Sequence, residues 1–151
     1  MAGAAPKLHI DASDLAVTVI VTSWHAEITD ALLAGAERAL KAAGNDVYTV
    51  MRVPGAFELP LAAQWAAEEG AEVIVTLGVV IRGDTPHFDY VCNAATDGLT
   101  RVQLDYSVPI GFGLLTVDNE AQALERAGLP NSKEDKGAEA VEAAVLMARL
   151  K

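Results

Sequence analysis

One stretch of the chain, Leu77–Val91 (LGVVIRGDTPHFDYV), constrains the fold more than any other. Its first part, Leu77–Ile81, is apolar without alternation, which is typical of a strand that is covered on both faces. Gly83 then predicts a turn, and Thr85 followed by Pro86 predicts a helix with Thr85 as its N-cap and Pro86 at its first position. A strand buried on both faces and followed directly by a helix is typical of a layered α/β fold.

The start of this predicted helix also carries a chemical signal. Free backbone N–H groups at a helix N-terminus form a ready anion site. His87 lies beside them, in the first helical turn. Ligands of parallel sheets bind beyond the carboxyl ends of the strands. An anion site and a titratable side chain at a strand end therefore predict an active site.

The rest of the chain alternates strands and helices in the same way. Ser23 is the expected N-cap of the first helix and Gly44 its terminating glycine, while Asn119–Gln122 has the form of a capping box before a short helix that Gly128 and Pro130 close. We expect strands at residues 15–22, 47–53, 72–81 and 108–115, and the other helices at about residues 57–69, 85–106 and 133–151. This alternation predicts a parallel sheet with helices on both faces.

Length and charge narrow the possible functions. The chain has 151 residues, enough for one domain, which we expect at residues 15–151 after an N-terminal arm of residues 1–14. A net charge of −10 argues against nonspecific binding of nucleic acid or of anionic membranes. The single cysteine, Cys92, excludes an internal disulfide, and with no membrane span or signal peptide in the sequence we expect a cytoplasmic protein.

Several motifs are missing from the sequence. The chain contains no dinucleotide-binding GxGxxG, no P-loop, no HExxH and no GxSxG. Its three histidines, His9, His25 and His87, do not have metal-ligand spacing. The sequence therefore carries no signature of a dinucleotide site, a P-loop or a histidine metal site.

Motifs in one consistent order resemble the lumazine synthase family over nearly the whole chain, from Val17 to the last helix. They are Pro54–Pro60 (PGAFELP), Leu77–Val91, Arg126–Gly128 and Lys136–Gly137. The resemblance implies a flavodoxin-like α/β/α sandwich with a four-stranded parallel sheet of order 2-1-3-4. It implies condensation of 5-amino-6-(D-ribitylamino)uracil with 3,4-dihydroxy-2-butanone 4-phosphate to 6,7-dimethyl-8-ribityllumazine, phosphate and water, without cofactor or metal. It also implies a homopentamer with active sites at the subunit interfaces.

The resemblance further assigns roles to residues near the strand ends. Residues implied in binding the heterocycle and its ribityl chain are Trp24, Ala56, Phe57, Glu58, Val79, Val80 and Ile81, with Phe112 and Lys136 from an adjacent subunit. Three of them have a purely structural alternative. Trp24 could cover the core edge, Phe112 could belong to the strand core, and the Glu58 carboxylate could simply stabilise a helix N-terminus.

The phosphate of the second substrate is expected at Gly83, Asp84, Thr85 and Arg126. Glycine allows close approach of an anion, and Asp84 can serve only through its backbone N–H. Arginine suits bidentate phosphate contacts. His87 is the expected proton-transfer group, because histidine can accept and donate protons near neutral pH.

Two other classes of function compete with this interpretation. One is a non-catalytic flavin- or lumazine-binding or shell protein, and the other is a riboflavin synthase of archaeal type. Neither needs a site for butanone phosphate. The link between Gly128 and Lys136 is longer than in relatives that form sixty-subunit shells, which favours a free pentamer.

Overall fold

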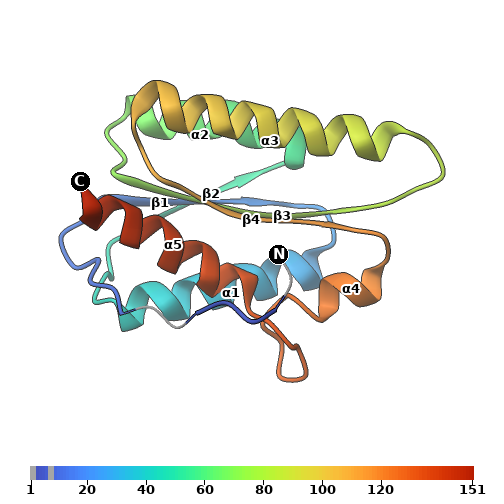
Figure 1. Cartoon of the computed structure of the whole chain (residues 1–151), viewed down its shortest axis with the longest axis horizontal. Coiled ribbons are helices and arrows are strands. Elements are labelled where there is room, and N and C mark those ends of the chain that lie inside the picture. The colour runs from blue at the N-terminus through green and yellow to red at the C-terminus, as the bar shows by residue number, and fades with distance from the viewer. Residues whose placement is uncertain (1–2, 7–8) are drawn as a thin grey trace.

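The computed structural model describes residues 3–6 and 9–151 as three layers, with a sheet between two groups of helices (Figure 1). The sheet is parallel and its order is β2-β1-β3-β4, so the predicted fold class and strand order are confirmed. The strands are β1 (Val17–Thr22), β2 (Thr49–Val53), β3 (Val73–Ile81) and β4 (Ile110–Val117). The helices are α1 (Ala26–Ala42), η1 (a 3₁₀ turn, Ala56–Glu58), α2 (Leu59–Glu68), α3 (His87–Tyr106), α4 (Glu120–Leu124) and α5 (Lys136–Leu150).

The central strand β3 is buried on both faces, as its apolar sequence predicts. Val73, Val75 and Leu77 belong to the core beneath α1 and α5, while Ile74 belongs to the core beneath α2 and α3. Figure 1 shows α2 and α3 on one side of the sheet and α1, α4 and α5 on the other. Alternate residues of a strand point to opposite faces, so one strand supplies both cores.

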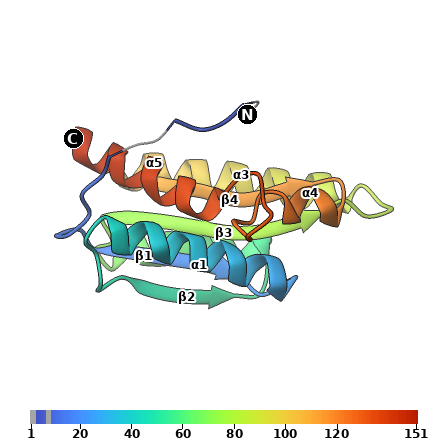
Figure 2. The ribbon, with the colours of Figure 1, turned by 90° about the horizontal axis from the view of Figure 1, so that it is seen from below.

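Small residues bring the layers close together. Helices α1 and α5 lie side by side across the strands (Figure 2). An added Cβ at Gly137 would lie 2.1 Å from the carbonyl oxygen of Leu32, and one at Gly111 would lie 2.2 Å from that of Ala140. Side chains at these two positions would push α5 away from α1 and from β4. The tight packing of small side chains explains how a chain with few aromatics fills two cores.

Helix α1 does not begin as expected. Its N-cap is His25, which has left-handed backbone angles (φ 55°, ψ 65°) and makes no side-chain cap hydrogen bond. The Ser23 hydroxyl donates instead to the Val53 carbonyl oxygen, at 2.9 Å. The prediction of Ser23 as N-cap is wrong, because this hydroxyl joins the ends of β1 and β2. Gly44, at φ 83°, follows the end of α1 as predicted.

Helix α5 begins at Lys136, so the prediction that it begins at Lys133 is wrong. The backbone N–H groups of Lys133 and Glu134 both donate to the Glu125 carbonyl oxygen, at 2.8 and 3.0 Å, and the chain is not helical there. The Asp135 side chain then caps α5 by accepting a hydrogen bond from the Ala138 N–H at 3.1 Å. These contacts fix residues 133–135 against the end of α4, which no local pattern reveals.

The other helix starts differ only in detail. Residues 56–58 form a 3₁₀ turn before α2. Helix α3 begins at His87 with Pro86 as its N-cap, so the prediction of Thr85 as N-cap and Pro86 as first helical residue is wrong by one position. The Thr85 hydroxyl accepts a hydrogen bond from the His87 N–H at 3.4 Å. The expected capping box of α4 is half formed: Asn119 accepts from Gln122 N–H, but the Gln122 side chain accepts from Asp118 N–H.

The N-terminal segment contacts the domain through residues 11–16. The buried Asn45 amide donates to the carbonyl oxygens of Ala12 and Leu15 at 2.8 and 2.9 Å, and Arg149 pairs with Asp14. Residues 1–2 and 7–8 of the predicted arm lie outside the described residues, and the division into an arm and a domain stays a prediction. No helix in the described part of the chain has the length and apolar character needed to span a membrane.

Candidate active site

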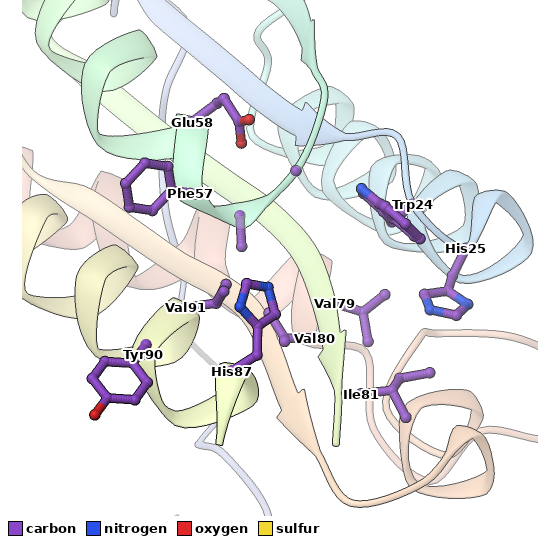
Figure 3. A pocket seen from close by; sticks show the side chains of 12 residues that line it. Trp24, His25, Phe57, Glu58, Val79, Val80, Ile81, His87, Tyr90 and Val91 are labelled. Carbon is purple, nitrogen blue, oxygen red and sulfur yellow. The ribbon is translucent and has the colours of Figure 1, made fainter. Parts of the chain in front are cut away.

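A cavity of about 560 Å³ lies beyond the carboxyl ends of the strands, in the position expected for a parallel sheet. Its volume is in the range of small-molecule sites. It is lined by Trp24, His25, Gly55, Ala56, Phe57, Glu58, Val79, Val80, Ile81, His87, Tyr90 and Val91. Figure 3 shows these residues together.

Segments after three strands build the cavity. Trp24 and His25 follow β1, Gly55–Glu58 follow β2, and Val79–Ile81 form the end of β3, from which the chain continues into α3 with His87. Eight residues predicted from the sequence therefore lie on one cavity: Trp24, Ala56, Phe57, Glu58, Val79, Val80, Ile81 and His87.

Sequence reasoning did not select four of the lining residues. Tyr90 and Val91 follow His87 on α3 at the i+3 and i+4 spacing that places residues on one helix face, so helical periodicity could have found them. His25 and Gly55 adjoin Trp24 and Ala56, which were predicted. A position next to a predicted residue in the sequence does not show whether the neighbour also lines the cavity.

Aromatic rings are exposed at the rim of the cavity. Trp24 is 67% exposed, and Phe57 and Tyr90 are 67% and 74% exposed. A tryptophan that covered the core edge would be largely buried. Trp24 is therefore a surface ring at the cavity, available to stack on a flat heterocycle, and Figure 3 shows it across the cavity from His87.

Trp24 and Glu58 both approach Gly55, which has no side chain to separate them from its backbone. A Cβ at Gly55 would lie 3.2 Å from Cδ1 and 3.3 Å from Nε1 of Trp24, and 3.6 Å from Oε2 of Glu58. The indole and the carboxylate thus approach the same backbone position. This arrangement presents a flat apolar surface beside a hydrogen-bond acceptor.

His25 is strained at the cavity wall. It is one of two non-glycine residues with positive φ in the described part of the chain. Its carbonyl oxygen accepts hydrogen bonds from the N–H groups of Ile28 and Thr29 at 2.9 and 3.0 Å, which starts α1. A left-handed conformation costs a residue with a Cβ of order 1 kcal/mol. The first turn of α1 offsets this strain and sets the direction in which Trp24 and His25 leave β1.

The predicted anion turn, Gly83–Thr85, is exposed and adjoins the cavity through Ile81 and His87. No heavy atom lies within 4 Å of the position of a Cβ at Gly83. The Asp84 side chain is exposed, and among the described residues no ion pair involves it. The turn is therefore open to an approaching anion.

Phe112, Arg126 and Lys136 do not line this cavity. Phe112 is 49% exposed on β4, the edge strand. Arg126 and Lys136 share the carboxylate of Glu134, at 3.6 and 3.1 Å, and Lys136 also pairs with Glu139 at 3.0 Å. We call Arg126, Glu134, Lys136 and Glu139 the loop cluster.

Charges within the loop cluster hold Lys136 in its protonated form. Burial lowers the pKa of Lys136, but its hydrogen bonds with Glu139 and Glu134 outweigh that effect, so its pKa lies above the ordinary value. Within one chain, the two cations of the loop cluster are already paired with its two carboxylates. In residues 3–6 and 9–151 no group of three or more histidine, cysteine or carboxylate side chains could hold a metal ion.

Comparison with known proteins gives one consistent result. The family model described as 6,7-dimethyl-8-ribityllumazine synthase matches residues 14–151. The chain is 64% identical over 140 residues to the 6,7-dimethyl-8-ribityllumazine synthase of Kineococcus radiotolerans, covering 93% of this chain and 87% of that protein. It is 58% identical over 146 residues to that of Leifsonia xyli subsp. xyli (97% and 90%), and 54% identical over 145 residues to that of Streptomyces coelicolor (95% and 90%).

Proposed function

The chain belongs to the 6,7-dimethyl-8-ribityllumazine synthase family, and we propose that the cavity beyond β1 and β3 is where it carries out that transferase reaction. The reaction condenses 5-amino-6-(D-ribitylamino)uracil with 3,4-dihydroxy-2-butanone 4-phosphate. The products are 6,7-dimethyl-8-ribityllumazine, phosphate and water, in the penultimate step of riboflavin biosynthesis. One observation carries the choice of site: a stacking ring, a carboxylate, an apolar strand end and His87 surround one cavity.

The ribitylaminouracil fits the part of the cavity between β1 and β3. The exposed Trp24 ring can stack on the pyrimidine, and Val79–Ile81 supply an apolar floor and backbone polar groups. Glu58 can accept hydrogen bonds from the hydroxyls of the ribityl chain, with Ala56 and Phe57 beside it.

The butanone phosphate fits the other side, next to α3. The exposed turn Gly83–Thr85 and the N-terminus of the long helix α3 favour a phosphate group. No lysine or arginine of the described residues lines the cavity. The positive charge that a phosphate needs must therefore come from outside this wall, and we assign it to Arg126 of an adjacent subunit.

Proton transfer is assigned to His87. The 5-amino group attacks the butanone carbonyl carbon and loses a proton as the carbonyl oxygen gains one. Loss of water then gives an imine. Removal of a proton from the adjacent hydroxyl-bearing carbon expels phosphate toward Gly83–Thr85 and leaves an enol, which becomes a ketone. The ribitylamino nitrogen attacks this ketone, and loss of a second water closes the ring. His87, on the cavity wall beside this turn, can accept and return protons in these steps. Because orientation of two bound reactants can supply much of a barrier reduction, we expect the cavity to contribute more than the histidine.

We propose that the active assembly is a homopentamer with the site between neighbours. The layer of η1, α2 and α3 exposes large apolar side chains, including Phe57, Leu61, Trp65 and Tyr90. Exposed apolar surface of this kind marks an interaction face. Phe112 and Lys136, which lie outside the cavity of their own chain, would then complete the site of the adjacent subunit.

The reaction requires no external electron carrier, so no cofactor is proposed. The one cysteine, Cys92, is a free thiol. A free thiol suits a reducing compartment, and we propose that the enzyme acts in the cytoplasm.

The purified protein, mixed with saturating concentrations of both substrates, should form a product with lumazine absorbance and release phosphate in equal amount. Absence of both under these conditions would contradict the proposal. Release of riboflavin from lumazine alone would instead favour the archaeal-type riboflavin synthase, and lumazine binding without turnover would favour a binding or shell protein. Sedimentation velocity should give a species of five subunits.

A further inference from the structure

Arg82 has no part in the site proposed above, although it connects the end of β3 to the anion turn. We propose that Arg82 is a positioning residue that clamps the first turn of α3, with His87 and the anion turn, to the corner between β4 and α4. This inference rests on the proposed function, since it concerns how that site keeps its geometry.

Four contacts join Arg82 to these elements. Its backbone N–H donates to the Val117 carbonyl oxygen at 2.9 Å. Its Nε donates to Oδ1 of Asp118 at 2.9 Å, and its Nη1 lies 3.6 Å from Oδ1 of Asp89 in α3. The guanidinium carbon lies 4.4 Å from the centre of the Phe88 ring, within the range of a cation–π contact.

The clamp continues into α4. The backbone N–H of Asp118 donates to Oε1 of Gln122 at 2.7 Å, and Gln122 N–H donates to Asn119 at 2.9 Å. Gln122 therefore holds the backbone of Asp118, whose side chain binds Arg82. One guanidinium connects β3, the β4–α4 corner and the first turn of α3, which no other side chain in the described residues does at this end of the sheet.

The connection that Arg82 holds has few other tethers. Residues 82–87 are all exposed, and the segment projects beyond the other strand ends (Figures 1 and 2). Within it, the Thr85 hydroxyl accepts from His87 N–H at 3.4 Å, a long hydrogen bond. The positions of His87 and of the anion turn therefore depend on Arg82, and small displacements of reacting groups are costly in rate.

The charges identify Arg82 as a clamp and not as a phosphate ligand. Two carboxylates, Asp118 and Asp89, already face one guanidinium, and the Phe88 ring occupies one of its flat sides. A phosphate at this guanidinium would have to compete with these two carboxylates for its charge. The two roles make opposite predictions for Asp118→Asn: loss of a clamp partner weakens phosphate-substrate binding, whereas release of a phosphate ligand strengthens it.

The test compares Arg82→Gln, Arg82→Lys and Asp118→Asn with a matched control, Arg101→Gln. Arg101 also pairs with an aspartate, Asp105, at 3.4 Å on the same helix α3, but far along it from the cavity. Steady-state kinetics give kcat and the KM of each substrate, and amide hydrogen exchange without substrate reports on residues 83–90.

For Arg82→Gln we expect kcat/KM for butanone phosphate to fall about 10-fold, with the KM of ribitylaminouracil changed less than about twofold, because its contacts lie across the cavity. Arg82→Lys should lose less activity than Arg82→Gln, because lysine keeps the positive charge. It lacks the planar guanidinium that binds two carboxylates and stacks on the Phe88 ring. Asp118→Asn should lower kcat/KM for butanone phosphate by a smaller factor. The double variant Arg82→Gln/Asp118→Asn should have the same kcat/KM as Arg82→Gln alone.

Exchange of residues 83–90 should become about 2- to 10-fold faster in Arg82→Gln and Asp118→Asn, and stay unchanged in Arg101→Gln. Unchanged exchange in Arg82→Gln would overturn the clamp. A lower KM for butanone phosphate in Asp118→Asn would overturn it in favour of a phosphate ligand.

The exchange measurement needs no turnover, so it tests the clamp separately from the proposed reaction. If the unmodified protein forms no lumazine, the proposed function fails while exchange still decides the clamp. If lumazine forms normally and exchange is unaffected by Arg82→Gln, the clamp alone fails.

Discussion

The residues expected at the active site fall into two regions that differ in what they contact within one chain. The cavity residues, represented by Trp24, Glu58 and His87, surround an open space with exposed rings. The loop cluster around Arg126 and Lys136 is closed on itself by ion pairs with Glu134 and Glu139. The comparison teaches that one chain builds the walls of a site but keeps its candidate cations elsewhere. Residues that the family resemblance assigns to one site need not lie together within a single chain.

The largest expected effect comes from the cavity. In His87→Ala, kcat should fall by about 100-fold, the low end of what general acid–base catalysis contributes, and residual activity should remain because the cavity still orients both substrates. Stopped-flow or steady-state lumazine formation measures this change. His9→Ala is the control, since His9 does not line the cavity. A rate equal to that of the unmodified protein would remove His87 from the mechanism.

The loop cluster should matter through an adjacent subunit. Arg126→Ala should raise the KM of butanone phosphate about 10- to 100-fold, because the variant loses a charge-assisted hydrogen bond to the phosphate. The KM of ribitylaminouracil should stay nearly constant. Lys133→Ala is the control, because Lys133 is exposed and pairs only with Glu125 in the described residues. An unchanged KM for the phosphate substrate would place Arg126 outside the site.

Mixed assemblies test directly whether the two regions meet between chains. When His87→Ala and Arg126→Ala chains are co-expressed in equal amounts, about one quarter of the interfaces in a ring combine an intact His87 with an intact Arg126. Activity should recover to about that fraction of the unmodified level. No recovery would show that both residues serve the same chain, and the two regions would then have to move together within one subunit.

A smaller effect is expected at Gly55, which Trp24 and Glu58 both approach. Gly55→Ala places a Cβ 3.2 Å from the indole, so the ring must shift by a few tenths of an ångström. The KM of ribitylaminouracil should rise about 2- to 5-fold, as expected when a methyl group crowds a packed site. For this KM, Gly83→Ala is the control, because a Cβ there meets no heavy atom within 4 Å and Gly83 belongs to the turn assigned to the other substrate. An unchanged KM in Gly55→Ala would mean that Trp24 does not contact the substrate.

The smallest effect concerns the acidic surroundings of the loop cluster. Burial raises the pKa of Glu142, and Glu139 and Asp135 raise it further. Since the folded state disfavours the charged form, Glu142 costs stability above its pKa, and that cost disappears as the pH falls below the ordinary value of 4.5.

Glu142→Gln should therefore raise the Tm at pH 7. The corresponding gain in free energy of unfolding should be less than about 1 kcal/mol, and it should vanish near pH 4. Thermal unfolding at both pH values measures it, with the exposed Glu69→Gln as control. A lower Tm for Glu142→Gln at pH 7 would show that the Glu142 carboxylate has a favourable partner.

Much of the fold followed from local patterns. The apolar run at Leu77–Ile81 and the glycine after the first helix, Gly44, predicted elements where the structure has them. The errors occurred where hydrogen bonds to distant segments fixed the local course of the chain. Ser23 binds the Val53 carbonyl in place of a helix terminus, and the N–H groups before Lys136 bind the Glu125 carbonyl. Such choices depend on which segments meet in space.

The sequence by itself determined the order of elements, the carboxyl ends of β1, β2 and β3 and the residue types that follow them, because periodicity, turns and helix caps act over a few residues. The end of β4 lies two residues beyond its predicted position. Only the tertiary structure decided that Trp24 stays exposed, that His25 takes a left-handed conformation, and that Arg82 binds Asp118 and Asp89. These features depend on contacts between segments that are far apart in the chain. Their energies come from packing and charge geometry, which a one-dimensional pattern does not contain.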